Sequence, residues 1–207
     1  MSTVSYVSLG CPKALVDSEH IVTALADENF EVVGENSDAG VVVVNTCGFI
    51  NQAKAESYAA IETAMENEQQ VVVTGCLGVE REELLRRYPA LKFVSGPGDT
   101  VQVVKAVKSL NGESVDRLYD PALVGRDSGN RVLLTPEHYA YLKIAEGCNH
   151  KCTFCIIPTM RGPLTSKTLG ELVEEAQALV ENGVKELLLI AQDLSAYGLD
   201  RQYGDKR

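Results

Sequence analysis

Short apolar runs alternate with amphipathic stretches along the first 110 residues. Residues 4–9, in which two serines interrupt the apolar residues, and residues 71–73 read as strands, and residues 41–44 are four consecutive valines. A continuous β-branched run is typical of a strand that is buried on both faces of a parallel sheet. The other elements predicted here are a helix carrying Ile21, Val22 and Leu25 on one face, helices at residues 52–68, 80–87 and 100–110, and a strand at residues 92–95. This alternation predicts an α/β fold, with helices on the faces of a parallel sheet.

A second, shorter pattern begins at residue 139. A predicted strand over residues 139–145 leads into a loop rich in glycine and cysteine, then into a helix and a strand over residues 186–191. Thr168 and Glu171 form a capping box at the start of the helix, and Gly183 suits the position that closes it. Its apolar stripe comprises Leu172, Val173, Ala176, Leu179 and Val180. Two strands and one helix are too few to bury a parallel sheet on both faces, so we expect a fragment of a larger domain.

Charge and turn-forming residues also divide the chain. Residues 1–130 hold 19 acidic and 10 basic side chains, whereas residues 131–207 hold 10 and 9. Turn-forming and charged residues gather between the two patterns. We therefore predict an N-terminal domain at residues 1–110, a linker with at most one short strand at residues 111–136, and a truncated second domain at residues 137–207.

Composition excludes several classes of protein. The 45% hydrophobic content is enough for a packed core, which argues against a disordered chain. The net charge of −10 argues against gripping nucleic acid through bulk charge. The longest aliphatic run has only four residues and the N-terminus lacks a signal-peptide pattern, so we expect a cytoplasmic protein with no membrane partner.

Six cysteines in such a chain favour metal or redox chemistry over disulfides. Cys148, Cys152 and Cys155 form a C-x3-C-x2-C motif on one irregular loop. Thiolates are soft ligands that favour iron–sulfur clusters, zinc or copper(I). Zinc with His150 as a fourth ligand stays an alternative, although His150 lies between two of the cysteines, and so does chance. On a four-iron cluster, three thiolates would leave one iron open to another ligand.

The other three cysteines are far apart in the sequence. Cys11, Cys47 and Cys76 each follow a predicted strand, and each has a neighbouring glycine. The carboxyl ends of parallel strands meet at one edge of the sheet, where α/β folds place their sites. The pattern thus predicts that the three thiols converge there, with glycine letting the backbone approach a bulky ligand. The alternative is that cysteine is simply a common buried residue.

The C-x3-C-x2-C loop, with Phe154 directly before its last cysteine, resembles that of the radical S-adenosylmethionine superfamily. The resemblance implies a [4Fe–4S] cluster whose open iron chelates the amino and carboxylate groups of S-adenosylmethionine. One-electron reduction then yields a 5′-deoxyadenosyl radical. The basic residues Lys151, Arg161 and Lys167 fit this loop electrostatically, or are ordinary solvated surface. Alternatively, the only role of Arg161 is to hold the cysteine loop in place.

Both cysteine sets together resemble the methylthiotransferase family, and the match covers essentially the whole chain. Three stretches resemble its ribosomal-protein branch: residues 8–19, 155–162 and 191–198. The branch that modifies tRNA usually has glutamine after the first cysteine, Tyr-Thr before the Arg-Gly pair, and Gly-Gln-Asn on the later strand. Here those positions read Pro12, Thr159-Met160 and Ala191-Gln192-Asp193. One departure from the ribosomal-protein branch is Ala14, where asparagine is expected.

The resemblance implies methylthiolation at the β-carbon of an aspartate in small-subunit ribosomal protein number twelve. An auxiliary [4Fe–4S] cluster on Cys11, Cys47 and Cys76 would carry the inserted sulfur, and Cys148, Cys152 and Cys155 would hold the radical-generating cluster. Phe154 would pack near the adenine of S-adenosylmethionine. Gln192 and Asp193 would approach its amino group, or else cap a turn. The electron donor would be a flavodoxin or ferredoxin, and the sulfur donor is left open.

The sequence leaves two other functions open. The chain could be a tRNA-adenosine methylthiotransferase, which shares both clusters. It could be a non-catalytic metal-binding or electron-transfer protein, although each set would then be one ligand short. In either radical function we expect residues 1–207 alone to be inactive, because a partial barrel leaves the S-adenosylmethionine site open to water and exposes a sheet edge.

Overall fold

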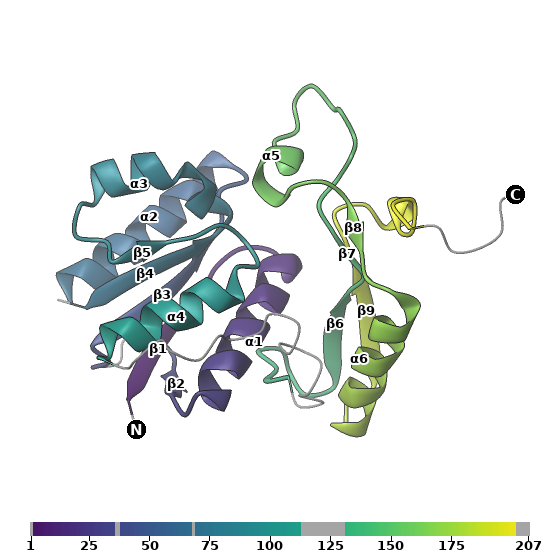
Figure 1. Ribbon diagram of the computed structural model, residues 1–207, viewed down its shortest axis with the longest axis horizontal. Helices are drawn as coiled ribbons and strands as arrows, with labels where there is room; N and C mark the ends of the chain where they lie inside the picture. Colours follow the sequence, from purple (N-terminus) through teal and green to yellow (C-terminus); the bar gives the residue numbers. More distant parts are fainter. Residues whose placement is uncertain (1, 36–37, 68, 113–130, 202–207) are drawn as a thin grey trace, which may run out of the picture. The chain divides into compact units, whose positions relative to one another are not determined.

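The computed structural model describes residues 2–35, 38–67, 69–112 and 131–201 (Figure 1). The chain divides into two compact units, Met1–Asp127 and Ser128–Arg207, and each unit has hydrophobic clusters of its own. Most of the predicted linker, residues 113–130, lies outside the described residues.

Unit 1 is built on a parallel sheet with the order β2-β1-β3-β4-β5. Its strands are β1 (Thr3–Ser8), β2 (Glu31–Val33), β3 (Val41–Thr46), β4 (Gln70–Gly75) and β5 (Phe93–Val94). The predicted parallel sheet is confirmed. The edge strand β2 has only three residues and begins with an exposed glutamate, which explains why the hydrophobic pattern did not reveal it.

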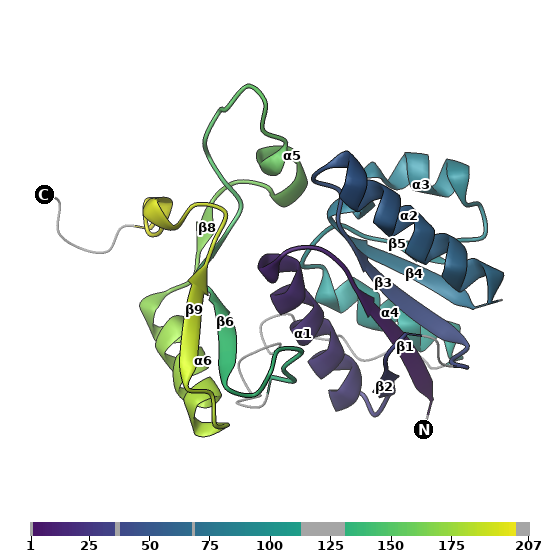
Figure 2. The same ribbon diagram turned by 180° about the vertical axis from the view of Figure 1, so that it is seen from behind.

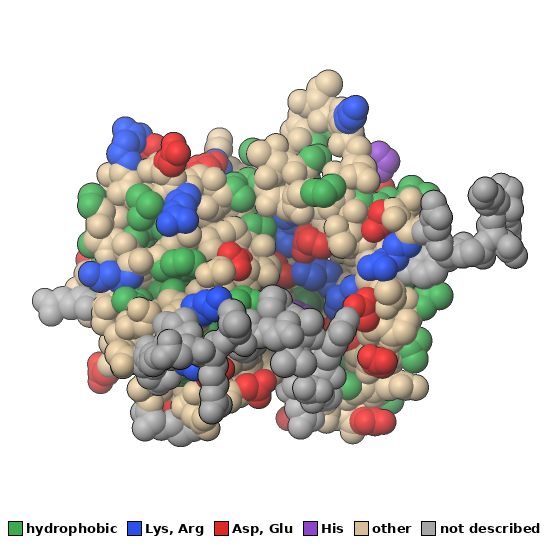
Figure 3. Space-filling model, viewed as in Figure 1, with side chains coloured by type: hydrophobic (Ala, Val, Ile, Leu, Met, Phe, Trp, Pro, Cys, Tyr) green, Lys and Arg blue, Asp and Glu red, His purple; other side chains and the backbone are tan. Residues whose placement is uncertain are grey.

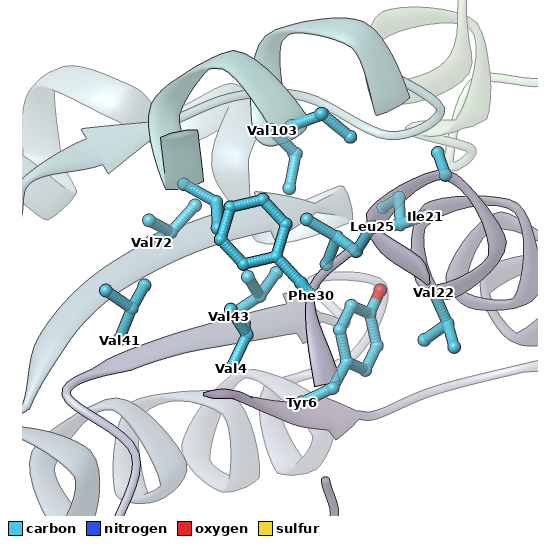
Figure 4. Packing of buried hydrophobic residues seen from close by; sticks show 13 residues of the cluster. Val4, Tyr6, Ile21, Val22, Leu25, Phe30, Val41, Val43, Val72 and Val103 are labelled. Carbon is cyan, nitrogen blue, oxygen red and sulfur yellow. The ribbon is translucent and has the colours of Figure 1, made fainter. Parts of the chain in front are cut away.

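Helices cover both faces of this sheet (Figures 1 and 2). They are α1 (Pro12–Asp27), α2 (Asn51–Glu66), α3 (Arg81–Arg87) and α4 (Thr100–Leu110), with a 3-10 helix, η1 (Cys76–Glu80), before α3. Helices α1 and α4 pack on one face, and α2 and α3 on the other. Val41 and Val43 enter the first core and Val42 and Val44 the second, so all four valines of β3 are buried. Figure 4 shows the first core, where Phe30 and Leu25 lie between the sheet and α1.

Unit 2 contains two small sheets. β6 (Tyr139–Lys143) pairs in parallel with β9 (Glu186–Ile190), and β7 (Ala145–Glu146) pairs antiparallel with β8 (Thr165–Ser166). Its helices are α5 (Ile157–Arg161), α6 (Leu169–Glu181) and the 3-10 helix η2 (Leu194–Ala196). The capping box of α6 is confirmed, because Thr168 Oγ1 accepts from the Glu171 N–H at 3.1 Å and the Glu171 carboxylate accepts from the Thr168 N–H at 2.7 Å.

The apolar stripe of α6 is covered only in part. Of its five residues Leu179 alone is buried, packed with Ala140 and Val184, whereas Val173 and Val180 are more than half exposed. The reason is physical: the sheet under α6 has two strands, too narrow to cover a helical face.

The surface of unit 1 carries acidic, basic and hydrophobic side chains interspersed on the face that Figure 3 shows. On that face the acidic side chains of this unit are not gathered at one place. Within the described part of the chain, none of the helices has the length and apolar character needed to cross a membrane.

Candidate functional site

Three cysteines of unit 1 follow neighbouring parallel strands. Cys11 is the N-cap of α1 after β1, Cys47 directly follows β3, and Cys76 begins η1 after β4. The strands β1, β3 and β4 are adjacent, and Asn45 pairs with Ser8 on one side and Thr74 on the other. The carboxyl ends of the strands are therefore level, and all three cysteines lie at the same edge of the sheet.

Contacts between the loops bring these cysteines closer still. A Cβ atom added at Gly10 would lie 3.1 Å from Cys47 Cβ and 3.4 Å from its Sγ. A Cβ atom at Gly48 would lie 3.1 Å from the backbone of Leu77 and 3.2 Å from the carbonyl carbon of Cys76. The first cysteine loop thus touches the second, and the second touches the third. The sequence pattern predicted that these glycines let the backbone approach a bulky ligand. In the structure, Gly10 and Gly48 let the loops approach one another.

Gly75, directly before Cys76, has a backbone that other residues rarely adopt. Its φ is +93° and its ψ is −165°, a region that essentially only glycine occupies. A Cβ atom here would lie 2.3 Å from Asn45 Oδ1 and 2.4 Å from the carbonyl oxygen of Thr46. The absence of a side chain at Gly75 therefore allows β4 to end against β3 and places Cys76 beside the Cys47 loop.

Buried polar side chains fix the same edge. The Asn45 amide donates to the Ala14 carbonyl at 2.9 Å and to Ser18 Oγ at 2.8 Å, which ties β3 to α1. Ser57 Oγ on α2 accepts from the Cys47 N–H at 3.0 Å and donates to the Cys47 carbonyl at 2.9 Å. Neither Asn45 nor Ser57 was predicted from the sequence. The polar Asn45 directly after four valines is a signal that could have been followed, because a buried amide needs partners.

The cysteines of unit 2 lie on a loop that leaves β7 and returns through α5 to β8 (Figure 1). Gly147 begins the loop at a φ of +75°, and a Cβ atom there would lie 2.1 Å from the Pro163 carbonyl oxygen. The Cys148 N–H donates to the Gly162 carbonyl at 3.1 Å, which closes the base of the loop. Cys152 is exposed, whereas Cys148 and Cys155 are half-buried.

Glu146, directly before this loop, binds several segments of unit 2. Its carboxylate accepts hydrogen bonds from Lys143 Nζ at 2.8 Å, the Gly147 N–H at 3.2 Å, Arg161 Nη1 at 3.1 Å to each oxygen, and Gln192 Nε2. Burial would raise the pKa of Glu146, but the charges of Lys143 and Arg161 outweigh it and lower the pKa to about 2. The carboxylate is therefore ionised at neutral pH. Glu146 was not predicted from the sequence, and among its partners only Arg161 was expected to brace the loop.

The predicted S-adenosylmethionine contacts have different environments. The Phe154 side chain is 92% exposed on the cysteine loop. The Gln192 amide nitrogen donates a hydrogen bond to the Glu146 carboxylate. The Gln192 amide oxygen is buried with no hydrogen-bond partner among the described residues. Asp193 caps the first turn of η2 through the Ser195 N–H at 2.9 Å and also pairs with His150 Nε2 at 2.7 Å. These bonds to Ser195 and His150 lower the pKa of Asp193.

The donor set of each unit is three thiols. None of the six cysteines, all within the described ranges, forms a disulfide. In the described part of the chain, no three His, Cys, Asp or Glu side chains lie close enough together to hold a single metal ion. His150, the possible fourth zinc ligand, is engaged with Asp193.

Comparisons with known proteins agree with this division of the chain. Residues 3–96 match the family model described as "Uncharacterized protein family UPF0004", and residues 142–201 match that of the radical SAM superfamily. A protein named ribosomal protein uS12 methylthiotransferase RimO from Methylorubrum extorquens is 53% identical over 97% of this chain, and the protein of that name from Bordetella pertussis is 54% identical. The chain spans 44% and 45% of their lengths, so less than half of each relative.

Among solved structures, a de novo designed Rossmann 2x3 fold protein aligns with 57% of this chain and 96% of its own. Its TM-score is 0.38 and its identity 14%, a likeness too weak to define a fold. The two family models cover the two units in order, and the curated relatives match across both. Across both units the chain is therefore similar to proteins named as RimO methylthiotransferases, and its second unit matches the radical S-adenosylmethionine superfamily.

Proposed function

We propose that the protein of which this chain is part methylthiolates the β-carbon of an aspartate in ribosomal protein uS12, by radical S-adenosylmethionine chemistry. The observation that carries the proposal is the pair of three-thiol sets, one at a sheet edge in unit 1 and one on a single loop in unit 2. The names of relatives that are 53% identical supply the substrate. A β-carbon C–H bond is unactivated, which calls for a cofactor able to break it.

Each thiol set fits a four-iron cluster by the chemistry of its donors. Cys11, Cys47 and Cys76 would hold an auxiliary [4Fe–4S] cluster, and Cys148, Cys152 and Cys155 the cluster that binds S-adenosylmethionine. A cluster takes one thiolate per iron, so its ligands lie further apart than the ligands of a single ion. This spacing suits the described residues, in which the cysteine loops of unit 1 touch but no three ligands group closely enough for a single ion. When bound, these groups supply one-electron cleavage of S-adenosylmethionine and the sulfur to be inserted.

The side chains of this chain position these groups. Ser57 holds the backbone of Cys47, and Asn45 holds the end of β3 against α1. In unit 2 the exposed ring of Phe154 would cover the adenine of S-adenosylmethionine. The unpartnered amide oxygen of Gln192 would accept from its amino group, and Asp193 lies beside it on the same turn.

The remaining partners follow from the reaction. Radical cleavage needs a one-electron donor, for which a flavodoxin or a ferredoxin is suited. Ribosomal proteins are basic on average, and the excess of nine acidic side chains in residues 1–130 would attract such a substrate. We place the protein in the cytoplasm with its substrate.

Metal analysis tests the cluster assignment. The chain, purified without oxygen and reconstituted with iron and sulfide, should hold about eight of each, as expected for two four-iron clusters. Replacing Cys11, Cys47 and Cys76 by serine should remove half of the iron, and replacing the other three cysteines should remove the other half. About one zinc with no sulfide would exclude the proposal and favour a non-catalytic metal protein.

Mass spectrometry of cells that lack the gene tests the substrate. The uS12 aspartate should lose the mass of one methylthio group, and the methylthio content of tRNA should be unchanged. Loss of the group from tRNA alone would instead assign the protein to the tRNA-modifying branch.

A further inference from the structure

We propose that Glu146 is a positioning residue that holds the base of the cysteine loop closed and sets the orientation of the Gln192 amide. This inference rests on the proposed function only in assigning the loop to a cluster and the amide to a ligand. Its geometric part concerns unit 2 alone.

The first observation is that Glu146 binds both arms of the loop. On the incoming arm its carboxylate accepts from the Gly147 N–H at 3.2 Å, and on the outgoing arm it accepts from Arg161 Nη1 at 3.1 Å. The bond between the Cys148 N–H and the Gly162 carbonyl, 3.1 Å long, joins the next residue of each arm. All three cysteines lie between these arms, so the contacts at Glu146 define where the loop begins and ends.

The second observation is that the same carboxylate binds the ends of both strands of the β6–β9 sheet. Lys143, the last residue of β6, donates its Nζ at 2.8 Å. Gln192 lies two residues after β9 and donates its amide nitrogen. Glu146 thus anchors the loop to the sheet, and hydrogen bonds to an ionised group are stronger than those between neutral groups.

The third observation is the orientation of the Gln192 amide, whose oxygen faces away from Glu146. An ionised carboxylate can only accept hydrogen bonds, so it orients the amide with its nitrogen toward Glu146. The amide oxygen then points elsewhere, buried and with no partner among the described residues. A buried acceptor without a partner is costly and is satisfied when a donor binds. The geometry therefore makes Gln192 an acceptor for a ligand that carries N–H groups, such as an amino group.

The charges show why a neutral replacement would fail. The Arg161 side chain is 1% exposed and that of Lys143 is 11% exposed, and both face the Glu146 carboxylate. Glu146→Gln would leave both cations beside an uncharged amide, which offers one acceptor oxygen in place of two and whose N–H groups cannot accept from them. The replacement would also remove the preference that orients Gln192.

Hydrogen exchange of the metal-free chain tests the geometric part. In E146Q the amides of Gly147 and Cys148 should exchange at least about tenfold faster than in the unchanged chain. The Gly147 N–H loses its charged acceptor, and the bond from the Cys148 N–H to the Gly162 carbonyl opens more often when the base of the loop is no longer held closed. Amides of α6 should be unaffected. Glu174→Gln is the matched control, since it removes one negative charge from an exposed position on α6. Equal exchange at Gly147 and Cys148 in E146Q and the unchanged chain would overturn the proposal.

The double variant E146Q/R161Q separates positioning from charge balance. Removing both partners of a buried pair is less destabilising than removing one, so its thermal unfolding temperature should recover toward that of the unchanged chain. If Glu146 positions the loop, the rapid exchange of Gly147 and Cys148 persists. If that protection returns with the stability, Glu146 only balances the charge of Arg161 and the proposal is wrong.

Spectroscopy of the reconstituted chain tests whether Glu146 orients the Gln192 amide for a ligand. Adding S-adenosylmethionine should change the electron paramagnetic resonance spectrum of the reduced cluster in the unchanged chain and in E174Q. In E146Q the iron content should be similar. The spectral change should need at least about tenfold more S-adenosylmethionine, because one oriented acceptor is lost. Equal titration in all three would refute the role in orienting Gln192. Failure of the unchanged chain to bind iron would reject the proposed function, while the exchange experiment still decides the geometry.

Discussion

Replacing Gly75 by alanine tests whether the cysteine loops of unit 1 are held together by close backbone packing. The added Cβ would lie 2.3 Å from Asn45 Oδ1, 2.4 Å from the Thr46 carbonyl oxygen and 2.7 Å from the Thr46 nitrogen. Distances below 3.0 Å require something to shift, and two of these atoms belong to the backbone of the neighbouring strand β3. The substitution therefore pushes the start of η1, and Cys76 with it, away from the end of β3.

The expected cost has two parts. A non-glycine residue at a φ of +93° and a ψ of −165° costs about 1–3 kcal/mol. Overpacking against atoms that cannot easily move adds about 1–3 kcal/mol. The two ranges together give about 2–6 kcal/mol, and the midpoint of about 4 kcal/mol is a large share of the roughly 5–15 kcal/mol typical of a folded domain. Iron bound through Cys76 should fall as well.

Native-state hydrogen exchange of β3, the central strand of the sheet, measures this cost in unit 1 alone. Exchange of its most protected amides should rise at least about a hundredfold in G75A. Gly98→Ala is the first control, because Gly98 has a φ of +73° but no atom within 4 Å of an added Cβ. Gly34→Ala is the second, with open space and no positive φ. If G75A changed exchange no more than G98A, close packing between the loops would not be what holds Cys76 in place.

Other contacts in both units lead to three more predictions. Gly147→Ala should lower the iron bound by the second cysteine set, because its Cβ would lie 2.1 Å from the Pro163 carbonyl oxygen, whereas Gly162→Ala, with a similar φ and open space, should retain more iron. Asn45→Ala should lower the free energy of unfolding of unit 1 by about 1–3 kcal/mol in urea titrations, since two buried hydrogen bonds to α1 are lost. Burial raises the pKa of Tyr6 above its ordinary value of 10, so its contribution to stability is complete below pH 10 and is lost above it. Tyr6→Phe should therefore reduce the fall in stability above pH 10, and an unchanged slope would contradict this.

Much of the fold could be predicted from local patterns. Four consecutive valines predicted a strand buried on both faces, and each pair of alternate valines enters a different core. The capping box at Thr168 also formed as expected, because its two hydrogen bonds lie within one turn of helix. The edge strand β2 and the short strands β7 and β8 were missed, because two or three residues are too few to show a period.

The sequence by itself determined the α/β class and the division of the cysteines into two sets of three, because strand periodicity and ligand spacing are local properties. Only the tertiary structure decided that the three loops of unit 1 touch, since strand order and register are set by packing between distant segments. The same holds for Glu146. Its carboxylate meets Arg161 and Gln192, 15 and 46 residues away in sequence, because the chain folds both segments back to the end of the same small sheet.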